Sequence, residues 1–412
     1  MMSVFSVVVT GQSLITRDVR QARDDRFDEV LRFLQQGDVA FTNFESTVLG
    51  RHGGWPTKGK YFGYSRPDVL DALKVIGFNA LALSNNHAFD LGPSGVLSTL
   101  DEVKAQGFLY AGIGADMTEA AEVGHRRLGD RDVALLALDA GPGPANMYAG
   151  NRTAFRPARP GVNALKTVRK IGVPIGQMQA LRALARELQM SDLERANYAQ
   201  PEDPPEIDDK SEIDLYGTIF KQAETCGRLV EVDLQSASEH LAAIRESAAL
   251  GDFVIAYLHH HHWEPNWQQV PSWVQGFARM CVDAGAGLFV SHGAPVLQAI
   301  EIYRRAPIFY GLGNFLFHTE PDESEWSPPE VWQSVVAACR YEGDDLVAID
   351  LLPIVINGQV RVDGHETASG LVPLAATGDT ARHILEQLAE RSRPFGVEVA
   401  IADGFGRIVP RD

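Results

Sequence analysis

The chain has 412 residues, of which 45% are hydrophobic and 22% charged, a balance typical of a folded protein with a sizeable core. Its formal net charge of −17 argues against binding to nucleic acids, because the phosphate backbone requires a basic surface. The three cysteines, Cys226, Cys281 and Cys339, are too few and too widely spaced for a disulfide framework, and we expect them to be reduced in a cytoplasmic protein.

Strands and helices alternate along the first 140 residues. The first apolar run is too short for a membrane span and lacks the basic flank of a signal peptide, so it is better interpreted as a core strand. Such alternation indicates βαβ units, whose functional side chains collect where the strands end. The predicted strands are residues 4–10, 39–43, 79–83, 109–110 and 133–139, and the predicted helices are 27–35, 67–76 and 94–105.

Residues 141–235 differ from the first segment in composition. They begin with a Gly-Pro-rich stretch, contain a predicted helix at 176–190, and include the acidic, proline-rich segment 201–210, which we expect to be an exposed loop. We interpret this region as an insertion that shapes or covers a site, with a disordered spacer as the alternative.

The alternation resumes after the insertion. The turn signals at 342–343 and 357–358 indicate β-hairpins near the C-terminus. We therefore expect one domain over residues 1–330, interrupted at about 141–235, with 331–412 completing it. The predicted helices are 238–250, 271–284 and 380–393, and the predicted strands are 253–258, 287–291, 307–312, 333–341, 345–353 and 359–363.

A run of four histidines, residues 259–262, follows the apolar segment FVIAYL. Because alternate side chains of a strand point to opposite faces, His259 and His261 should project together, with His260 and His262 on the other side. Two imidazoles on one face at a strand end would be a pair of metal ligands. The alternative is a histidine-rich loop that is merely polar.

Polar residues follow several other predicted strands. Since the carboxyl ends of strands in an α/β sheet converge, these side chains could meet around one ion. Carboxylate, amide oxygen and imidazole together suit Mn, Zn or Fe(II). The residues in question are Gln12, Asn43, Glu45, Asn85, Asn86, His87, Asp90, His259, His261, His292 and Asn314.

The chain resembles a known family in several of these stretches. Residues 84–92, SNNHAFDLG, resemble the ANNHxxDxG signature of the CapA/PgsA family, which is named for poly-γ-glutamate capsule synthesis. Residues 42–45, TNFE, resemble its NLE element, and residues 307–315, PIFYGLGNF, resemble its PIFYSLGNF element. Further matching stretches are residues 95, 99–100, 111–114, 283–285, 291–293 and 296–303. The combination is specific and spans residues 4–318.

The resemblance implies an α+β fold of the calcineurin-like metallophosphatase type, with a β-sandwich flanked by helices in α/β/β/α layers. His87, paired with Asp90, would protonate a leaving group or stabilise the transition state, and a metal-activated water would be the nucleophile. The implied cofactor is one or two divalent ions of Mn, Zn or Fe. The implied metal ligands are Glu45, Asn86, His259, His261 and His292.

Three departures from the family pattern bear on this expectation. The first motif of the family usually reads GD, but here Gln12 follows Gly11. The second histidine of its final motif aligns with Pro295, and its HWGxE element is replaced by the histidine run and Trp263-Glu264. The site could therefore hold a single ion, with Gln12, Asn43, His262 or Asn314 as further metal or substrate ligands.

Three functions remain compatible with the sequence. The first is a metal-dependent hydrolase of a phosphoester or an amide-type bond, acting on a small-molecule or γ-glutamyl-type substrate, with Arg51, Lys58 or Arg159 as substrate-binding residues. The second is a non-hydrolytic accessory protein of poly-γ-glutamate or capsule biosynthesis, and the third is a degenerate binding module. The sequence predicts no nucleic-acid partner and no membrane span, and it is compatible with a homo-oligomer.

Overall fold

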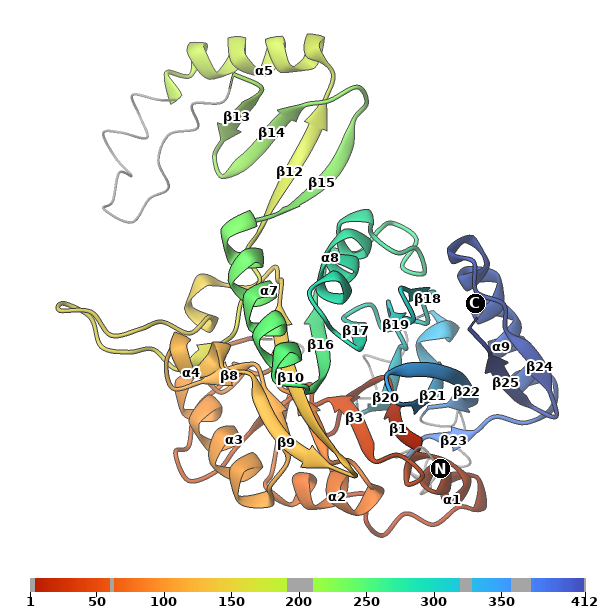
Figure 1. The fold of residues 1–412 in the computed structure, drawn as a ribbon. Helices are drawn as coiled ribbons and strands as arrows, with labels where there is room; N and C mark the ends of the chain where they lie inside the picture. Colours follow the sequence, from red (N-terminus) through yellow and green to blue (C-terminus); the bar gives the residue numbers. More distant parts are fainter. Residues whose placement is uncertain (1–3, 60–62, 191–209, 319–327, 357–371, 411–412) are drawn as a thin grey trace, which may run out of the picture. The chain divides into compact units, whose positions relative to one another are not determined.

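The computed structural model divides the chain into two compact units (Figure 1). The first unit comprises Met1–Leu165 and Ser238–Asp412, and the second comprises Lys166–Ala237. Within the part of the chain that the structure describes, no helix is both long enough and apolar enough to cross a membrane. The described residues are 4–59, 63–190, 210–318, 328–356 and 372–410.

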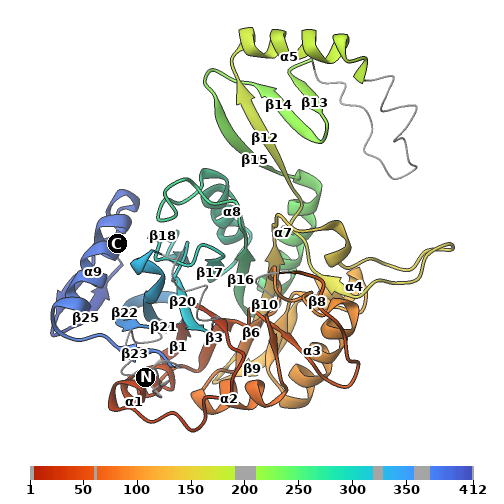
Figure 2. The same cartoon turned by 180° about the vertical axis from the view of Figure 1, so that it is seen from behind.

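The larger sheet of the first unit has a parallel half and an antiparallel half, seen from opposite sides in Figures 1 and 2. The strands β1, β3, β6 and β7 run parallel to one another, and β21 pairs antiparallel with β1. The order is β24 (Ala400–Ala402), β25 (Phe405–Ile408), β22 (Asp345–Val355), β21 (Gln333–Glu342), β1 (Val4–Val9), β3 (Val39–Asn43), β6 (Ala80–Ala82) and β7 (Leu109–Ala111), with β23 (Leu374–Ala375) beside β22.

The second sheet of this unit is built around four parallel strands, β10, β16, β17 and β19. Its order is β18 (Ile300–Tyr303), β19 (Ala306–Phe309), β17 (Leu288–His292), β16 (Phe253–His259), β10 (Arg131–Asp139) and β9 (Gly124–Leu128).

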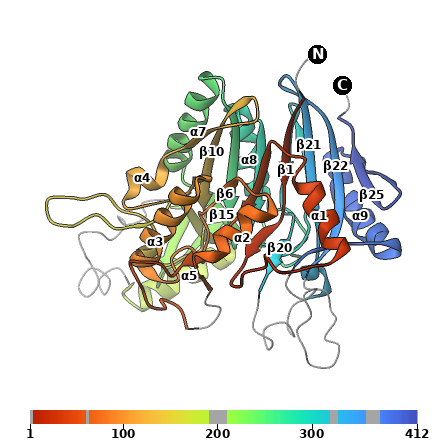
Figure 3. The ribbon, with the colours of Figure 1, turned by 90° about the horizontal axis from the view of Figure 1, so that it is seen from below.

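The two sheets pack face to face, and Figure 3 shows them as two layers. Alternate residues of both sheets form one core between the layers. The rings of Phe5 and Phe253 meet there at 5.2 Å, and those of Phe41 and Tyr257 at 5.7 Å. Burying the apolar side of each sheet in this way is what the alternating hydrophobic pattern of their strands requires.

Helices cover the outer faces of this sandwich. The helices α1 (Asp25–Leu34), α2 (Asp68–Ile76) and α3 (Gly92–Gln106) pack on the outward-facing residues of the larger sheet. On the second sheet, α8 (Ser272–Asp283) packs Phe277 against Phe289, and α7 (Leu234–Ala249) lies outside β10 in Figure 3. The α9 helix (Gly378–Ser392) packs on the inner face of β22 and β25 beside β18. This arrangement confirms the predicted α+β sandwich flanked by helices.

Two helix ends illustrate why the sequence forms these elements where it does. The side chain of Asp24 accepts a hydrogen bond from the backbone amide of Arg26 and thereby caps the start of α1. Gly107 ends α3 with a φ of +67°, a conformation that glycine adopts without steric cost. The remaining described strands and α-helix of the first unit are short: β2 (Gln12–Leu14), β4 (Thr47–Val48), β5 (Tyr64–Ser65), β8 (Ile113–Gly114), α4 (Met117–Ala121), β11 (Gly161–Val162) and β20 (Asn314–Phe317).

The second unit is a small sheet with one helix. Its strand order is β13 (Glu212–Leu215), β14 (Thr218–Gln222), β12 (Thr167–Val173) and β15 (Gly227–Val232), and α5 (Ile175–Glu187) contacts β13 and β14. The helix was predicted from the sequence, whereas these four strands were not. The predicted strand at 359–363 and its turn at 357–358 lie outside the described residues, as does almost all of the segment 201–210.

Candidate metal centre

Three polar residues lie side by side at the carboxyl ends of adjacent parallel strands. In the second sheet, Asp139 of β10 is opposite His259 of β16, which in turn is opposite His292 of β17. The residues two positions earlier, Ala137, Tyr257 and Val290, all belong to the core between the sheets. Because side chains alternate along a strand, the three polar residues face the same inner side, at the carboxyl ends of these strands.

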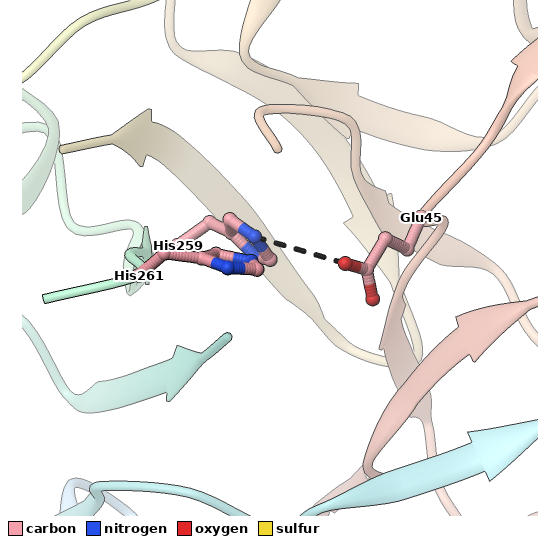
Figure 4. A group of neighbouring side chains, drawn as sticks. All are labelled: Glu45, His259 and His261. Atoms are coloured by element: carbon pink, nitrogen blue, oxygen red, sulfur yellow. Dashed lines mark ion pairs between the residues drawn. The ribbon is translucent and has the colours of Figure 1, made fainter. Parts of the chain in front are cut away.

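Glu45, which follows β3 of the opposite sheet, faces the histidine pair (Figure 4). Its Oε1 lies 3.7 Å from Nε2 of His259, and the rings of His259 and His261 are 5.1 Å apart. One ligand atom from each of the three residues lies within 4.8 Å of the other two. The amide oxygen Oδ1 of Asn86 approaches Nε2 of His259 at 3.0 Å. Three ligand atoms therefore lie close together, and the Asn86 oxygen lies beside one of them, Nε2 of His259.

The buried atoms of this cluster fit a divalent cation. Among the described residues, neither Oε2 of Glu45 nor Nε2 of His261 has a hydrogen-bond partner, although both atoms are buried. Such orphaned polar atoms are costly unless an ion or water satisfies them. A carboxylate, two imidazoles and an amide oxygen form the kind of ligand set that borderline ions such as Mn, Fe(II) and Zn accept.

The pKa shifts in the cluster follow mainly from burial. Burial, together with the nearby carboxylates Asp90 and Asp139, raises the pKa of Glu45 to about 8 despite the opposing charge of Lys58. Burial lowers the pKa of His261 to about 3, with His87 and Lys58 adding to the effect. Its imidazole is therefore neutral at ordinary pH, which is the protonation state that binds metal.

A second group, His87 with Asp90 and Lys58, lies next to the cluster. Nδ1 of His87 is 2.6 Å from Oδ2 of Asp90, which also accepts a hydrogen bond from the backbone amide of Gly63 at 3.0 Å. Nζ of Lys58 lies 2.7 Å from the other carboxylate oxygen and also donates to the carbonyl of Asn86. Because an ionised carboxylate only accepts, Nδ1 of His87 carries the hydrogen and Nε2 is left for a reactant.

The other two histidines of the run point elsewhere, as strand alternation predicts. The rings of His260 and His262 both pack against Trp273, at 5.1 and 5.7 Å. Nε2 of His262 lies 2.9 Å from the carbonyl oxygen of Ala140, so this ring nitrogen is not directed at the cluster. On the opposite side, the ring of Trp263 lies 4.9 Å from that of His261 and supports it by packing.

The buried amides expected near the site hold backbone and loops together. Oε1 of Gln12 accepts a hydrogen bond from the amide of Gly293 at 3.2 Å, next to His292. Oδ1 of Asn43 accepts one from Asn85 at 3.0 Å. Nδ2 of Asn314, which is opposite Gln12 in the β2–β20 pair, donates to the carbonyl of Val331 at 3.2 Å.

The two predicted substrate-binding arginines have protein partners. Arg51 forms an ion pair with Asp101 at 2.6 Å, and its side chain is 74% exposed. Nε of Arg159 donates to the carbonyl oxygen of Tyr148 at 2.8 Å. The Tyr148 hydroxyl in turn donates to Oδ2 of Asp139 at 2.8 Å. Sequence reasoning missed Asp139, although an acidic residue that closes the apolar strand 133–139 was the available signal.

Comparison with known proteins identifies the family. Residues 6–319 match the family described as "Bacterial capsule synthesis protein PGA_cap". The chain belongs to the PGA_cap family. This confirms the resemblance drawn from the motifs.

One relative of this PGA_cap protein has no role in its name, and another is named for capsule biosynthesis. "Uncharacterized protein y4sH" of Sinorhizobium fredii (strain NBRC 101917 / NGR234) is 29% identical over 98% of this chain and 93% of its own length. "Capsule biosynthesis protein CapA" of Bacillus anthracis is 22% identical over 85% of this chain and 67% of that protein.

Among solved structures, the crystal structure of a 5'-nucleotidase precursor from Thermus thermophilus aligns with 11% identity and a TM-score of 0.31. The alignment covers 95% of this chain and 59% of the nucleotidase, so the PGA_cap chain spans less than two thirds of that protein.

Proposed function

We propose that this PGA_cap protein is a divalent-metal-dependent hydrolase. The observation that carries the proposal is the buried cluster of Glu45, His259 and His261, which lies beside a histidine–carboxylate pair. The cation would be held by Glu45, Asn86, His259 and His261, with His292 beside them. A divalent cation at this place supplies Lewis acidity toward the oxygen of a phosphoryl or carbonyl group and lowers the pKa of a nearby water.

In this proposal His87 is the general acid. The ring acts as the imidazolium: its Nδ1–H stays hydrogen-bonded to Asp90, and its Nε2–H gives the proton to the leaving group, which leaves the neutral ring with its hydrogen on Nδ1. Asp90 stabilises the charged imidazolium and fixes the orientation of its ring. Lys58 and the Gly63 amide hold the two oxygens of Asp90 in place, so that the imidazole does not need to reorient during the reaction.

The bond attacked is a phosphoester or an amide-type bond. An assay on substrates of both kinds distinguishes the two. The metal-free protein is loaded with Mn²⁺, Zn²⁺ or Fe²⁺ and assayed on p-nitrophenyl phosphate, bis(p-nitrophenyl) phosphate and γ-glutamyl-p-nitroanilide. We expect the protein to hydrolyse either the phosphoesters or the amide, and to do so only when it is loaded with metal. His87→Ala should keep the metal and lose about 10²–10⁴-fold in kcat, the usual contribution of general acid catalysis.

His262→Ala is the matched control, because this histidine belongs to the same run but bonds the Ala140 carbonyl. It should keep both the metal and most of the turnover. Equal loss of turnover in His87→Ala and His262→Ala would contradict the role of His87.

A second candidate function is a non-hydrolytic accessory role in capsule biosynthesis. The name of the Bacillus anthracis relative, which is a capsule biosynthesis protein, favours this candidate. A protein that binds the metal but hydrolyses none of the three substrates, nor γ-glutamyl oligomers, would support it over the hydrolase.

A further inference from the structure

Asp139 is a buried carboxylate with one satisfied oxygen and one orphaned oxygen. The residue is 1% exposed. Its Oδ2 accepts hydrogen bonds from the Tyr148 hydroxyl at 2.8 Å and from the Gly141 amide at 3.1 Å. Among the described residues, Oδ1 has no hydrogen-bond partner. The charge of Lys58 acts on Asp139, but Lys58 is already paired with Asp90. A carboxylate buried in this state is unfavourable unless positive charge is supplied from elsewhere.

Asp139 lies next to the candidate metal centre, where a bound cation would supply that positive charge. Asp139 is the immediate neighbour of His259 in the row of strand ends, and its side chain faces the same inner side as His259 and His292. Its charge is close enough to contribute to the raised pKa of Glu45, which lies on the opposite side of the same space. Asp139 is not among the residues whose ligand atoms lie within 4.8 Å of one another, so it would act on a cation held by that cluster through its charge and not as a direct ligand.

The surrounding loop holds this carboxylate in a fixed orientation. The backbone amide and carbonyl of Asp139 bond to Asn163 and Leu165, and the next amide, that of Ala140, donates to the carbonyl of His259. Tyr148 is itself held by Arg159, which donates to its carbonyl oxygen. The segment after β10 therefore connects Asp139 rigidly to the histidine strand and to Tyr148.

We propose that Asp139 supplies a second carboxylate charge to the cation site and raises its affinity for divalent metal, and that Tyr148 is the positioning residue that orients this carboxylate. The inference rests on the metal-binding part of the proposed function. It adds an acidic residue that lies outside the stretches through which the chain resembles its family.

The test measures the Kd for Mn²⁺ by calorimetry, together with the thermal midpoint of the metal-free protein at pH 8. The variants are Asp139→Asn and Tyr148→Phe. The matched control is Asp132→Asn, an exposed aspartate on the same strand that pairs with Arg127. We expect Asp139→Asn to weaken Mn²⁺ binding by about 10–100-fold, the usual effect of removing a group that supports metal ligands. Tyr148→Phe should weaken it by a smaller factor, and Asp132→Asn should not change it.

The midpoint of the metal-free protein distinguishes this role from a structural one. Removing an uncompensated buried charge should leave the midpoint of Asp139→Asn unchanged or higher, whereas loss of a structural residue would lower it. Unchanged Mn²⁺ affinity in both variants, or a weakened affinity of Asp139→Asn accompanied by a lowered midpoint of that variant, would overturn the inference while the hydrolase proposal stands. If Asp139→Asn fails to fold, the Mn²⁺ affinity of Tyr148→Phe alone tests the inference. A wild-type protein that binds no Mn²⁺, Zn²⁺ or Fe²⁺ would overturn both proposals.

Discussion

Replacing Glu45 by glutamine should stabilise the metal-free protein and at the same time abolish its response to metal. Glu45 is 3% exposed, and burial is the main reason that its pKa is about 8 instead of the ordinary 4.5. Between pH 4.5 and pH 8 the folded protein therefore holds a proton that the unfolded chain releases. A raised carboxyl pKa of this kind makes the folded state less stable as the pH rises through that window.

The magnitude follows from the same pKa. Each pH unit above 4.5 lowers the free energy of unfolding by about 1.36 kcal/mol. Burial of Glu45 therefore lowers the free energy of unfolding by about 3 kcal/mol at pH 7 and by less than about 1 kcal/mol at pH 5. Glutamine does not titrate, so Glu45→Gln escapes this cost. The variant should exceed the wild type in free energy of unfolding by up to about 3 kcal/mol at pH 7.

The assay is urea unfolding of both proteins at pH 5 and pH 7, first with a chelator and then with saturating Mn²⁺. With Mn²⁺ the order should reverse, because only the wild type gains stability from binding the ion. A control is Glu301→Gln, since Glu301 is also buried but is paired with Arg279 at 2.6 Å and with the Tyr310 hydroxyl. That variant should lose about 1–3 kcal/mol instead. A Glu45→Gln protein that is less stable than wild type at pH 7 without metal would refute this reasoning.

Two further predictions concern the histidine run and the core. His261→Ala should lose bound metal while His262→Ala retains it, as measured by elemental analysis, because only the first ring lies beside Glu45; equal metal content in both would contradict the alternation. Phe41→Ala should lower the free energy of unfolding by about 3–5 kcal/mol in urea, because it removes a fully buried ring that packs on Tyr257 between the sheets. A loss below about 1 kcal/mol would show that the two sheets do not pack as described.

Local patterns predicted the parts of the site that lie close together in the sequence. Alternation along the strand that ends at His259 separates His259 and His261 from His260 and His262, and the structure shows this separation. His87 and Asp90, which the family resemblance pairs, lie three residues apart and are in hydrogen-bond contact. Most strands of the two sheets were also predicted, because burying one face of a sheet produces alternating or continuous apolar runs. The strands β9, β18, β23, β24 and β25 were not predicted.

Partners that are distant in the sequence could not be predicted in the same way. Lys58 pairs with Asp90, whereas Arg51, only seven positions earlier, pairs with Asp101. The local composition does not determine which acidic side chain forms an ion pair with each of these two cations, because that depends on the three-dimensional course of the loop that carries them. Asp139 was missed for a related reason, since its significance comes from its neighbours on adjacent strands. The strands of the second unit are mostly half-buried, so they lack the apolar periodicity that reveals a strand.

The most direct test of the metal centre is elemental analysis of the purified protein and of His259→Ala. His259 lies at the middle of the row of strand ends and approaches both Glu45 and Asn86. We expect about one equivalent or more of Mn, Fe or Zn in the wild type and its loss in a folded His259→Ala protein. A wild-type protein that holds no metal even after incubation with each ion, or a His259→Ala protein that retains the full amount, would contradict this expectation.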